Sequence, residues 1–203
     1  MAKTRTFIGV GLSAPVGREI AAAVDRLRSA APSVRCVAEA NLHCTLRFVG
    51  DLGDQQLVEV CTAVQAATRG FEPFSVELGG AGAFPNIANA RTLWIGVASG
   101  GASGSAPGSA SGSDALLALQ ADIDEAVTAL GHRGEKRRYV PHVTIGRINR
   151  GADGASSTLA EELARLESFV AGTTPVTEVT IFASELERDG PVYHVLARCP
   201  LGG

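Results

Sequence analysis

The sequence holds little of what marks several large classes of protein. Aromatic residues make up 5% of its 203 residues, and histidine occurs four times. No apolar run approaches the roughly 20 residues that a membrane-spanning helix needs. The apolar segment after the basic start is interrupted by Pro15 and Arg18, so we interpret it as a first strand and not as a secretory signal. These absences predict a cytoplasmic protein with no membrane association.

Cysteine usage and charge exclude further classes. The four cysteines, at positions 36, 44, 61 and 199, have no Cys-x-x-Cys spacing, which favours free thiols in a reducing compartment over a structural zinc site. A net charge of -3 argues against a protein that coats long nucleic acid, while it leaves room for a basic pocket that holds a small anionic end. The sequence also lacks a Gly-rich phosphate loop and a Gly-x-Ser-x-Gly nucleophile turn.

Residue periodicity predicts the elements of an α+β protein with antiparallel sheets. Alternating polar and apolar residues predict strands, and apolar residues at helical spacing predict helices. The expected strands cover residues 6–12, 42–49, 74–78, 92–97, 140–148, 176–182 and 192–198, and the expected helices cover residues 15–29, 54–68, 114–130 and 158–169. They do not follow the regular βαβ alternation of a doubly wound sheet.

One segment differs in composition from the rest. Every residue from Ala98 to Ser113 is Ala, Gly, Ser or Pro, and such a segment cannot bury enough apolar area to hold one conformation. It lies between an expected strand and an expected helix. We therefore predict a single domain over residues 1–203, with residues 98–113 as a flexible insertion.

Two of the four histidines stand in matched short patterns. His43-Cys44-Thr45-Leu46 and His142-Val143-Thr144-Ile145 both read His, apolar, Thr, aliphatic, and they are 99 residues apart. In a strand, successive side chains point to opposite faces, so the His and Thr of each copy share a face. By the same alternation we expect Arg47 on the face of His43 and Thr45, with Cys44, Leu46 and Phe48 in the core.

The second copy differs at the position of its arginine. Strict alternation places Arg147 on the face opposite His142 and Thr144, unless the strand bulges at Gly146, which a glycine permits. With that bulge, we predict that Arg147 contacts a phosphate. The two copies also indicate an internal duplication about an approximate two-fold axis.

Two imidazoles and two hydroxyls suit phosphodiester chemistry. One histidine can remove a proton from an attacking water while the other protonates the departing oxygen, and the threonines can donate hydrogen bonds to phosphate oxygens. A zinc site is the competing chemical interpretation, because His43 neighbours Cys44. Alternation argues against it, since Cys44 should point away from His43, and neither histidine has a carboxylate at ligand spacing.

These residues resemble the 2H phosphoesterase superfamily, and within it the bacterial and archaeal RNA 2',3'-cyclic phosphodiesterases, which are also called 2'-5' RNA ligases. The resemblance covers nearly the whole chain. It rests on the segments Arg5–Val10, Asn41–Gly50, Gly82–Pro85, Leu93–Val97, Tyr139–Arg147, Ser184–Leu186 and on Tyr193.

The resemblance implies a two-lobed fold, with two antiparallel sheets and flanking helices around a central cleft. It also implies hydrolysis of RNA 2',3'-cyclic phosphate ends to 2'-phosphomonoesters, without metal or cofactor, and reversible 2'-5' ligation by the same groups. We expect the protein to act as a monomer. In the family's mechanism His43 would protonate the leaving 3' oxygen and His142 would activate water. Thr45, Thr144, Arg47 and Arg147 would bind the phosphate.

Several points stay open at this stage. Among the aromatic residues, Phe84 and Tyr139 are the candidates for stacking on an RNA base. The basic run Lys136-Arg137-Arg138 either contacts the RNA backbone or forms a solvated turn. A phosphodiesterase for a small cyclic nucleotide or a 2'-5' oligonucleotide, or a non-catalytic protein that binds RNA ends, would also be compatible with parts of the pattern.

Overall fold

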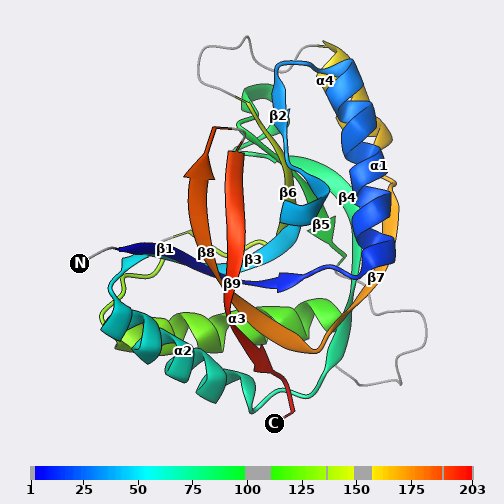
Figure 1. Cartoon of the computed structure of the whole chain (residues 1–203). Helices are drawn as coiled ribbons and strands as arrows, with labels where there is room; N and C mark the ends of the chain where they lie inside the picture. Colours follow the sequence, from blue (N-terminus) through cyan, green and yellow to red (C-terminus); the bar gives the residue numbers. More distant parts are fainter. Residues whose placement is uncertain (1–2, 99–110, 136, 149–156, 189, 203) are drawn as a thin grey trace.

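A computed structural model describes residues 3–98, 111–135, 137–148, 157–188 and 190–202 of the chain (Figure 1). The strands in these ranges are β1 (Thr4–Gly11), β2 (Val34–Cys36), β3 (His43–Leu52), β4 (Phe74–Phe84), β5 (Thr92–Val97), β6 (His142–Ile148), β7 (Val170–Val176), β8 (Glu178–Glu187) and β9 (Gly190–Pro200). The helices are α1 (Ala14–Ala30), α2 (Asp54–Thr68), α3 (Gly112–Ala129) and α4 (Ser157–Arg165), with short 3-10 helices η1 (Glu39–Asn41) and η2 (Ile87–Asn89).

The strand order is symmetric about the two strands that carry the motifs. It runs β7-β4-β5-β6-β3-β1-β8-β9, with β2 paired to β6, and each pairing described is antiparallel. We call β3, β1, β8 and β9 lobe 1, and β6, β5, β4 and β7 lobe 2. The prediction of an α+β, two-lobed antiparallel fold is confirmed.

The lobes meet at the motifs themselves. Within the described ranges β3 and β6 pair through one register position, Cys44 opposite Val143. Hydrogen bonding therefore joins the two expected sheets into one curved sheet with a narrow junction. Because Cys44 and Val143 each stand between the His and the Thr of a motif, the junction holds the two motifs next to each other.

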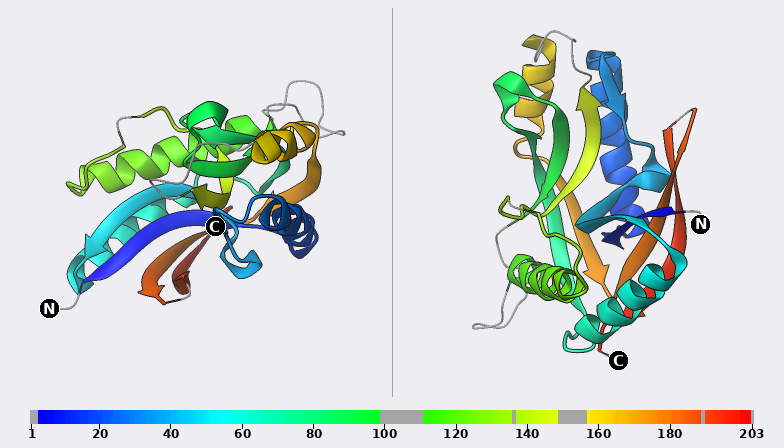
Figure 2. Two further views of the ribbon diagram at one scale, coloured as in Figure 1. Left: turned by 90° about the horizontal axis from the view of Figure 1, so that it is seen from above. Right: turned by 90° about the vertical axis from the view of Figure 1, so that its left-hand side faces the viewer.

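The helices form two pairs at opposite ends of the sheet, α1 with α4 and α2 with α3 (Figures 1 and 2). The connecting helices cross between the lobes. Helix α1 follows β1 of lobe 1 and packs on β7 of lobe 2, whereas α3 follows β5 of lobe 2 and packs on β3 of lobe 1 as well as on β4. None of the described helices is long and apolar enough to cross a membrane.

The expected strands and helices are present, with differences that have local causes. The three-residue strand β2 and the edge strand β7 were not predicted. Strand β7 contains Gly172, with a φ of 107°, and Pro175, which removes a ladder donor and is tolerated at a sheet edge. The last helix ends at Arg165, four residues before its expected end, and β7 begins at Val170.

The last two residues of the predicted insertion belong to α3, while residues 99–110 lie outside the described ranges. Ala98 donates its backbone N–H to the carbonyl of Glu77, and α3 begins at Gly112, with Ser111 as its side-chain cap. Gly112 was expected in the insertion. A β-carbon there would lie 1.8 Å from the carbonyl oxygen of Ser75, so only glycine allows the helix to start this close to β4.

Candidate active site

Both motifs begin a strand, and both strands bulge at the same motif position. In β3, Ile8 and Gly9 of β1 face Arg47 and Thr45, so Leu46 is the extra residue. In β6, Leu93 and Trp94 of β5 face Gly146 and Thr144, so Ile145 is the extra residue. A bulge places two residues opposite one and moves every later side chain to the other face. The aliphatic residue that ends each motif is thus the point at which alternation breaks.

The bulge makes the prediction for Arg47 wrong. Arg47 is 3% exposed, forms an ion pair with Asp124 of α3 and donates to the carbonyl of His132 at 2.9 Å. Phe48, expected in the core, is 50% exposed and its ring packs 6.0 Å from that of Phe7. Arg47 therefore connects β3 to α3 and does not lie on the face that carries His43 and Thr45, which we call the motif face. Phe48 lies on the motif face instead.

In the second copy the predicted bulge brings Arg147 to the motif face. Arg147 is exposed, whereas Ile145, Gly146 and Ile148 on either side of it are buried. A β-carbon on Gly146 would lie 2.6 Å from Cγ1 of Val34, which explains a glycine at the position that corresponds to Arg47. Counted from the histidine of each motif, position 147 therefore corresponds to position 48. We call each motif with its neighbouring residues a half-site, and the two half-sites carry an arginine and a phenylalanine in equivalent places.

Backbone carbonyls fix which nitrogen of each imidazole carries the hydrogen. His43 Nδ1 lies 2.8 Å from the carbonyl oxygen of Asn41, and His142 Nδ1 lies 2.7 Å from that of Val140. Since a carbonyl only accepts, Nδ1 donates in both residues, and Nε2 is the nitrogen that gains or loses a proton. His43 Nε2 lies 2.9 Å from Oγ1 of Thr45, so the first motif connects its own imidazole and hydroxyl.

Charges of one half-site influence the pKa of the histidine in the other, as expected from the adjacent motifs. Burial is the main cause that lowers the pKa of both histidines. A positive charge on His142 further lowers the pKa of His43, and the charge of Arg147 lowers the pKa of both. The carboxylate of Glu135 acts in the opposite direction on the pKa of His142. These influences agree with the register of β3 with β6, in which the two motifs lie side by side. The site can therefore hold an anion between two imidazoles and a guanidinium.

Aromatic rings surround His43 more closely than sequence reasoning indicated. Its ring centroid lies 4.8 Å from that of Phe7 and 5.3 Å, edge-on, from that of Tyr193 of β9. Burial raises the pKa of Tyr193, and the charges of Arg147 and Arg5 oppose that rise. Sequence reasoning missed Tyr193 as a site residue, since it lies 150 positions from His43 and has no motif of its own.

The two residues predicted to stack on a base have different positions. Phe84 packs edge-on against His142, with ring centroids 4.9 Å apart, and beside Trp94, at 5.3 Å. It therefore lies at the second half-site, as a base-stacking residue would. Tyr139 is packed against the core, and its hydroxyl donates to the carbonyl of Thr45 at 2.9 Å. The packing of its ring on the core and this hydrogen bond of its hydroxyl argue against the predicted role in stacking.

A cavity of about 500 Å³ opens beside His43, on the lobe 1 side of the site. Phe182, Tyr193 and Val195 give it an apolar wall. Its charged lining residues are Glu39, Glu178 and Arg198, and the last two form an ion pair. The cavity thus offers hydrogen-bonding groups and aromatic surface beside the histidine, but its cation is already neutralised.

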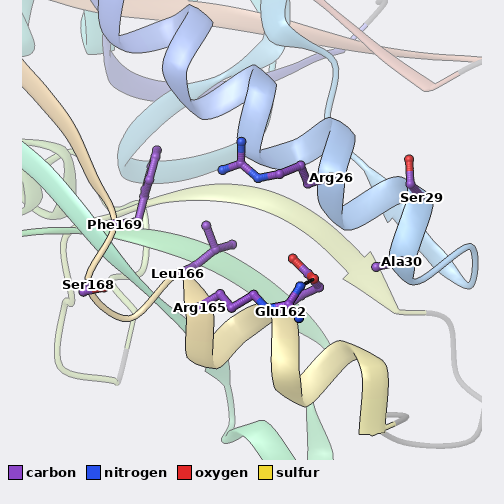
Figure 3. A pocket seen from close by; sticks show the side chains of 8 residues that line it. All are labelled: Arg26, Ser29, Ala30, Glu162, Arg165, Leu166, Ser168 and Phe169. Atoms are coloured by element: carbon purple, nitrogen blue, oxygen red, sulfur yellow. Dashed lines mark hydrogen bonds and ion pairs between the residues drawn. The ribbon is translucent and has the colours of Figure 1, made fainter.

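A second hollow, of about 530 Å³, lies between α1 and α4 (Figure 3). Its lining residues are Arg26, Ser29, Ala30, Glu162, Arg165, Leu166, Ser168 and Phe169. Arg165 lies 2.5 Å from Glu162 and is neutralised by it. None of these residues belongs to a motif, so we locate the candidate site at the histidines.

Two other predictions concern metals and the basic run. Cys44 is buried in the core, with its Sγ 3.5 Å from the hydroxyl of Tyr139, which agrees with the expectation that it points away from His43. The part of the chain that the structure describes has no cluster of three or more His, Cys, Asp or Glu side chains that could hold a metal ion. Arg137 and Arg138 are exposed, and Lys136 lies outside the described residues.

Comparison with known proteins identifies related sequences and related folds. Residues 16–187 match the sequence profile of the 2'-5' RNA ligase superfamily. An RNA 2',3'-cyclic phosphodiesterase of Methanothermobacter thermautotrophicus is 35% identical over 193 residues, which cover 94% of this chain and 95% of that protein. The crystal structure of TT0787 from Thermus thermophilus superposes with a TM-score of 0.75 at 25% identity, over 98% of both chains. That of E. coli LigT gives 0.70 at 22% identity, over the full length of both, and shows the shared fold.

Proposed function

The chain belongs to the 2'-5' RNA ligase superfamily, and from this membership and the paired histidines we propose that it hydrolyses RNA 2',3'-cyclic phosphate ends to 2'-phosphomonoesters. The observation that supports the proposal is the pairing of Cys44 with Val143, which sets the two His-x-Thr motifs side by side, with both imidazoles held in the same tautomer. In this proposal the whole chain acts as one domain and as a monomer, without metal or nucleotide cofactor.

The reaction needs a base and an acid on opposite sides of phosphorus. We propose that Nε2 of His142 takes a proton from the attacking water, while Nε2 of His43 gives one to the departing 3' oxygen of the ribose. The water oxygen forms the new P–O bond as the P–O3' bond breaks, which leaves the phosphate on the 2' oxygen. Attack by a 5'-hydroxyl in place of water would form a 2'-5' linkage with the same groups.

Positive charge and hydroxyl groups would stabilise the phosphorane-like transition state. Arg147 would supply the charge-assisted contact, and the hydroxyls of Thr45 and Thr144, each two residues after its histidine in the same strand, would donate to non-bridging oxygens. Arg47 has no part in this proposal, because it is buried against Asp124.

The terminal nucleoside would extend from the phosphate into the cavity beside His43. In the proposed mechanism His43 protonates an oxygen of that ribose, so the ribose lies on the His43 side. The cavity of about 500 Å³ falls within the usual size of small-molecule sites, and its ion-paired Arg198 favours a neutral nucleoside over a second phosphate. Phe48 of β3 and Phe84 of β4 are candidates for contact with the next bases.

The test is incubation of the purified protein in excess EDTA with a short RNA ending in a 2',3'-cyclic phosphate. Mass and the position of the phosphate identify the product. We expect a 2'-phosphomonoester. A 3'-phosphomonoester, or dependence on added metal, would contradict the mechanism. Turnover of adenosine 2',3'-cyclic phosphate but not of RNA would favour a small cyclic nucleotide as substrate, and bound but uncleaved RNA would favour a binding protein.

A further inference from the structure

The junction between the half-sites is narrow, and side chains from one segment of the chain stabilise it. Within the described ranges, Cys44 opposite Val143 is the register position that pairs β3 with β6. The bulge at Leu46 follows two residues later and interrupts the β1–β3 ladder. A bulge disrupts local pairing, so the backbone of the first motif needs other partners to keep its position.

Those partners come from the segment between β5 and β6. Gln120 of α3 donates to the carbonyl of Leu46 at 3.4 Å, and Asp124 of α3 holds Arg47. The hydroxyl of Tyr139, three residues before His142, donates to the carbonyl of Thr45 at 2.9 Å. Tyr139 thus connects the threonine of the first motif to the chain that enters the second motif.

The Tyr139 hydroxyl is fixed as a donor. Burial raises its pKa far above the usual value, with a smaller contribution from Cys44, so it stays protonated. The second motif has no such side chain. Position 40 corresponds to position 139 and is Ala40, and the carbonyl of the bulge residue Ile145 is held by the backbone N–H of Val37 at 2.9 Å.

We propose that Tyr139 is a positioning residue, whose hydroxyl holds the carbonyl of Thr45 and so fixes the His43–Thr45 pair at its working distance from His142. This inference rests on the proposed function, because it assigns Tyr139 a part in the same reaction. The hydroxyl does not touch substrate. It acts through the backbone of Thr45, whose Oγ1 lies 2.9 Å from Nε2 of His43.

Loss of the hydrogen bond from Tyr139 to the carbonyl of Thr45 should affect the reaction rate more than it affects substrate binding. Acid–base transfer requires the two imidazoles to meet opposite sides of phosphorus, and a misplacement of about 1 Å can cost up to about 100-fold in rate. In the proposed mechanism substrate binding uses Arg147 and the lobe 1 cavity, and Tyr139 is not among the residues that line that cavity. A loosened junction should therefore lower kcat and leave KM nearly unchanged.

The experiment compares Tyr139→Phe with a matched control, Thr68→Val. Thr68 is fully buried in α2, and its hydroxyl donates to the carbonyl of Gln65 at 3.1 Å, so the control also deletes one buried hydroxyl. We expect Tyr139→Phe to lower kcat on the RNA cyclic phosphate about tenfold with KM within about twofold. Thr68→Val should lose comparable thermal stability and keep kcat. 4-Aminophenylalanine at 139, which retains a donor, should restore most of kcat.

A titration of His43 by NMR gives a readout that does not depend on turnover. The charged or titratable groups that face His43 are His142 and Arg147 of β6, Tyr193 of β9, and Glu39, Glu178 and Arg198 around the adjoining cavity. None is altered in these variants. Because burial is the main cause that lowers the pKa of His43, a looser junction that admits water should raise it toward the ordinary value in Tyr139→Phe, and not in Thr68→Val.

Two results would overturn the inference: a kcat and a His43 titration that are both unchanged in Tyr139→Phe, or equal effects from Thr68→Val. If Tyr139→Phe does not fold, 4-fluorophenylalanine at 139, closer in size to tyrosine, takes its place. If the wild type does not hydrolyse the RNA cyclic phosphate, the proposed function fails, and the His43 titration still decides whether Tyr139 positions that residue.

Discussion

The two half-sites share a motif and a bulge, yet their surroundings differ. His43 is enclosed by rings from β1, β8 and β9, whereas His142 has Phe84 and Trp94 at its side. The first residue on the motif face after the bulge is Phe48 in one copy and Arg147 in the other. The repeated motif therefore sets the backbone and the tautomer, and the neighbouring residues give each imidazole a different environment. Groups in different environments can take different proton-transfer roles.

The way each motif is held differs as well. The first bulge is held by side chains from α3 and by Tyr139, and the second by the backbone of the segment that contains β2. Each half of the chain thus supports the motif of the other half. The junction of the lobes is for that reason a shared structure, which neither half could form alone.

The largest expected effect comes from the histidines. His43→Ala and His142→Ala should each lower kcat on an RNA 2',3'-cyclic phosphate by about 10²–10⁴-fold, because general acid and base catalysis contribute about that much. Steady-state kinetics of both variants, with circular dichroism to verify folding, make the comparison. Near-normal turnover by either variant would mean that its half-site has no chemical role.

The residue after each bulge offers the next comparison. Arg147→Ala should lower kcat/KM by about 100-fold, as expected for loss of one transition-state contact to the phosphate. Phe48→Ala should raise KM for RNA by about fivefold, in line with a lost stacking contact, and leave kcat near that of the wild type. Comparable losses of kcat in both variants would contradict the division between a charged and an aromatic half-site.

The corrected position of Arg47 predicts a loss of stability with little loss of activity. Arg47→Met leaves the Asp124 carboxylate without its partner. Because the Asp124 side chain is 35% exposed, we expect a cost of about 1–3 kcal/mol, less than for a fully buried pair. Denaturant unfolding measures it, and kcat per folded molecule should stay within a few-fold. A 100-fold loss of kcat at unchanged stability would restore Arg47 as a phosphate ligand.

The smallest expected effect concerns pH and stability. The pKa of His43 and of His142 is lower in the folded protein than in the unfolded chain. Between the folded and unfolded values the unfolded chain binds more protons, so stability should fall as the pH drops below about 6.5. Unfolding at pH 7 and pH 5 should show a smaller loss in His43→Gln than in the wild type. An equal loss would indicate that the enclosure of His43 does not affect its protonation.

Sequence patterns predicted the strand faces correctly before each bulge and less well after it. The His and Thr of each motif precede the bulge, so simple alternation placed them correctly. Gly146 marked the possible bulge in the second copy, and Arg147 was predicted on that condition. Leu46 and Arg47 carry no such mark, so Arg47 and Phe48 were assigned to each other's faces.

Contacts between distant segments could not be predicted from local patterns. The Tyr139 hydroxyl reaches a carbonyl 94 positions away, and the ring of Tyr193 in β9 contacts that of His43 in β3. The sequence alone does not distinguish Tyr139, whose hydroxyl is a hydrogen-bond donor, from Tyr193, whose ring forms part of a cavity wall. The packing of the two residues shows the difference. The strands β2 and β7 were missed because one is short and the other contains glycine and proline.

The most direct test of divided roles uses a substrate whose leaving group needs no proton. A p-nitrophenyl phosphodiester of adenosine would be given to His43→Ala and His142→Ala, and nitrophenolate release followed against the wild type. If His43 is the acid and His142 the base, His43→Ala should retain kcat within about tenfold of the wild type, while His142→Ala stays reduced by at least about 100-fold. Equal losses in the two variants would contradict the account.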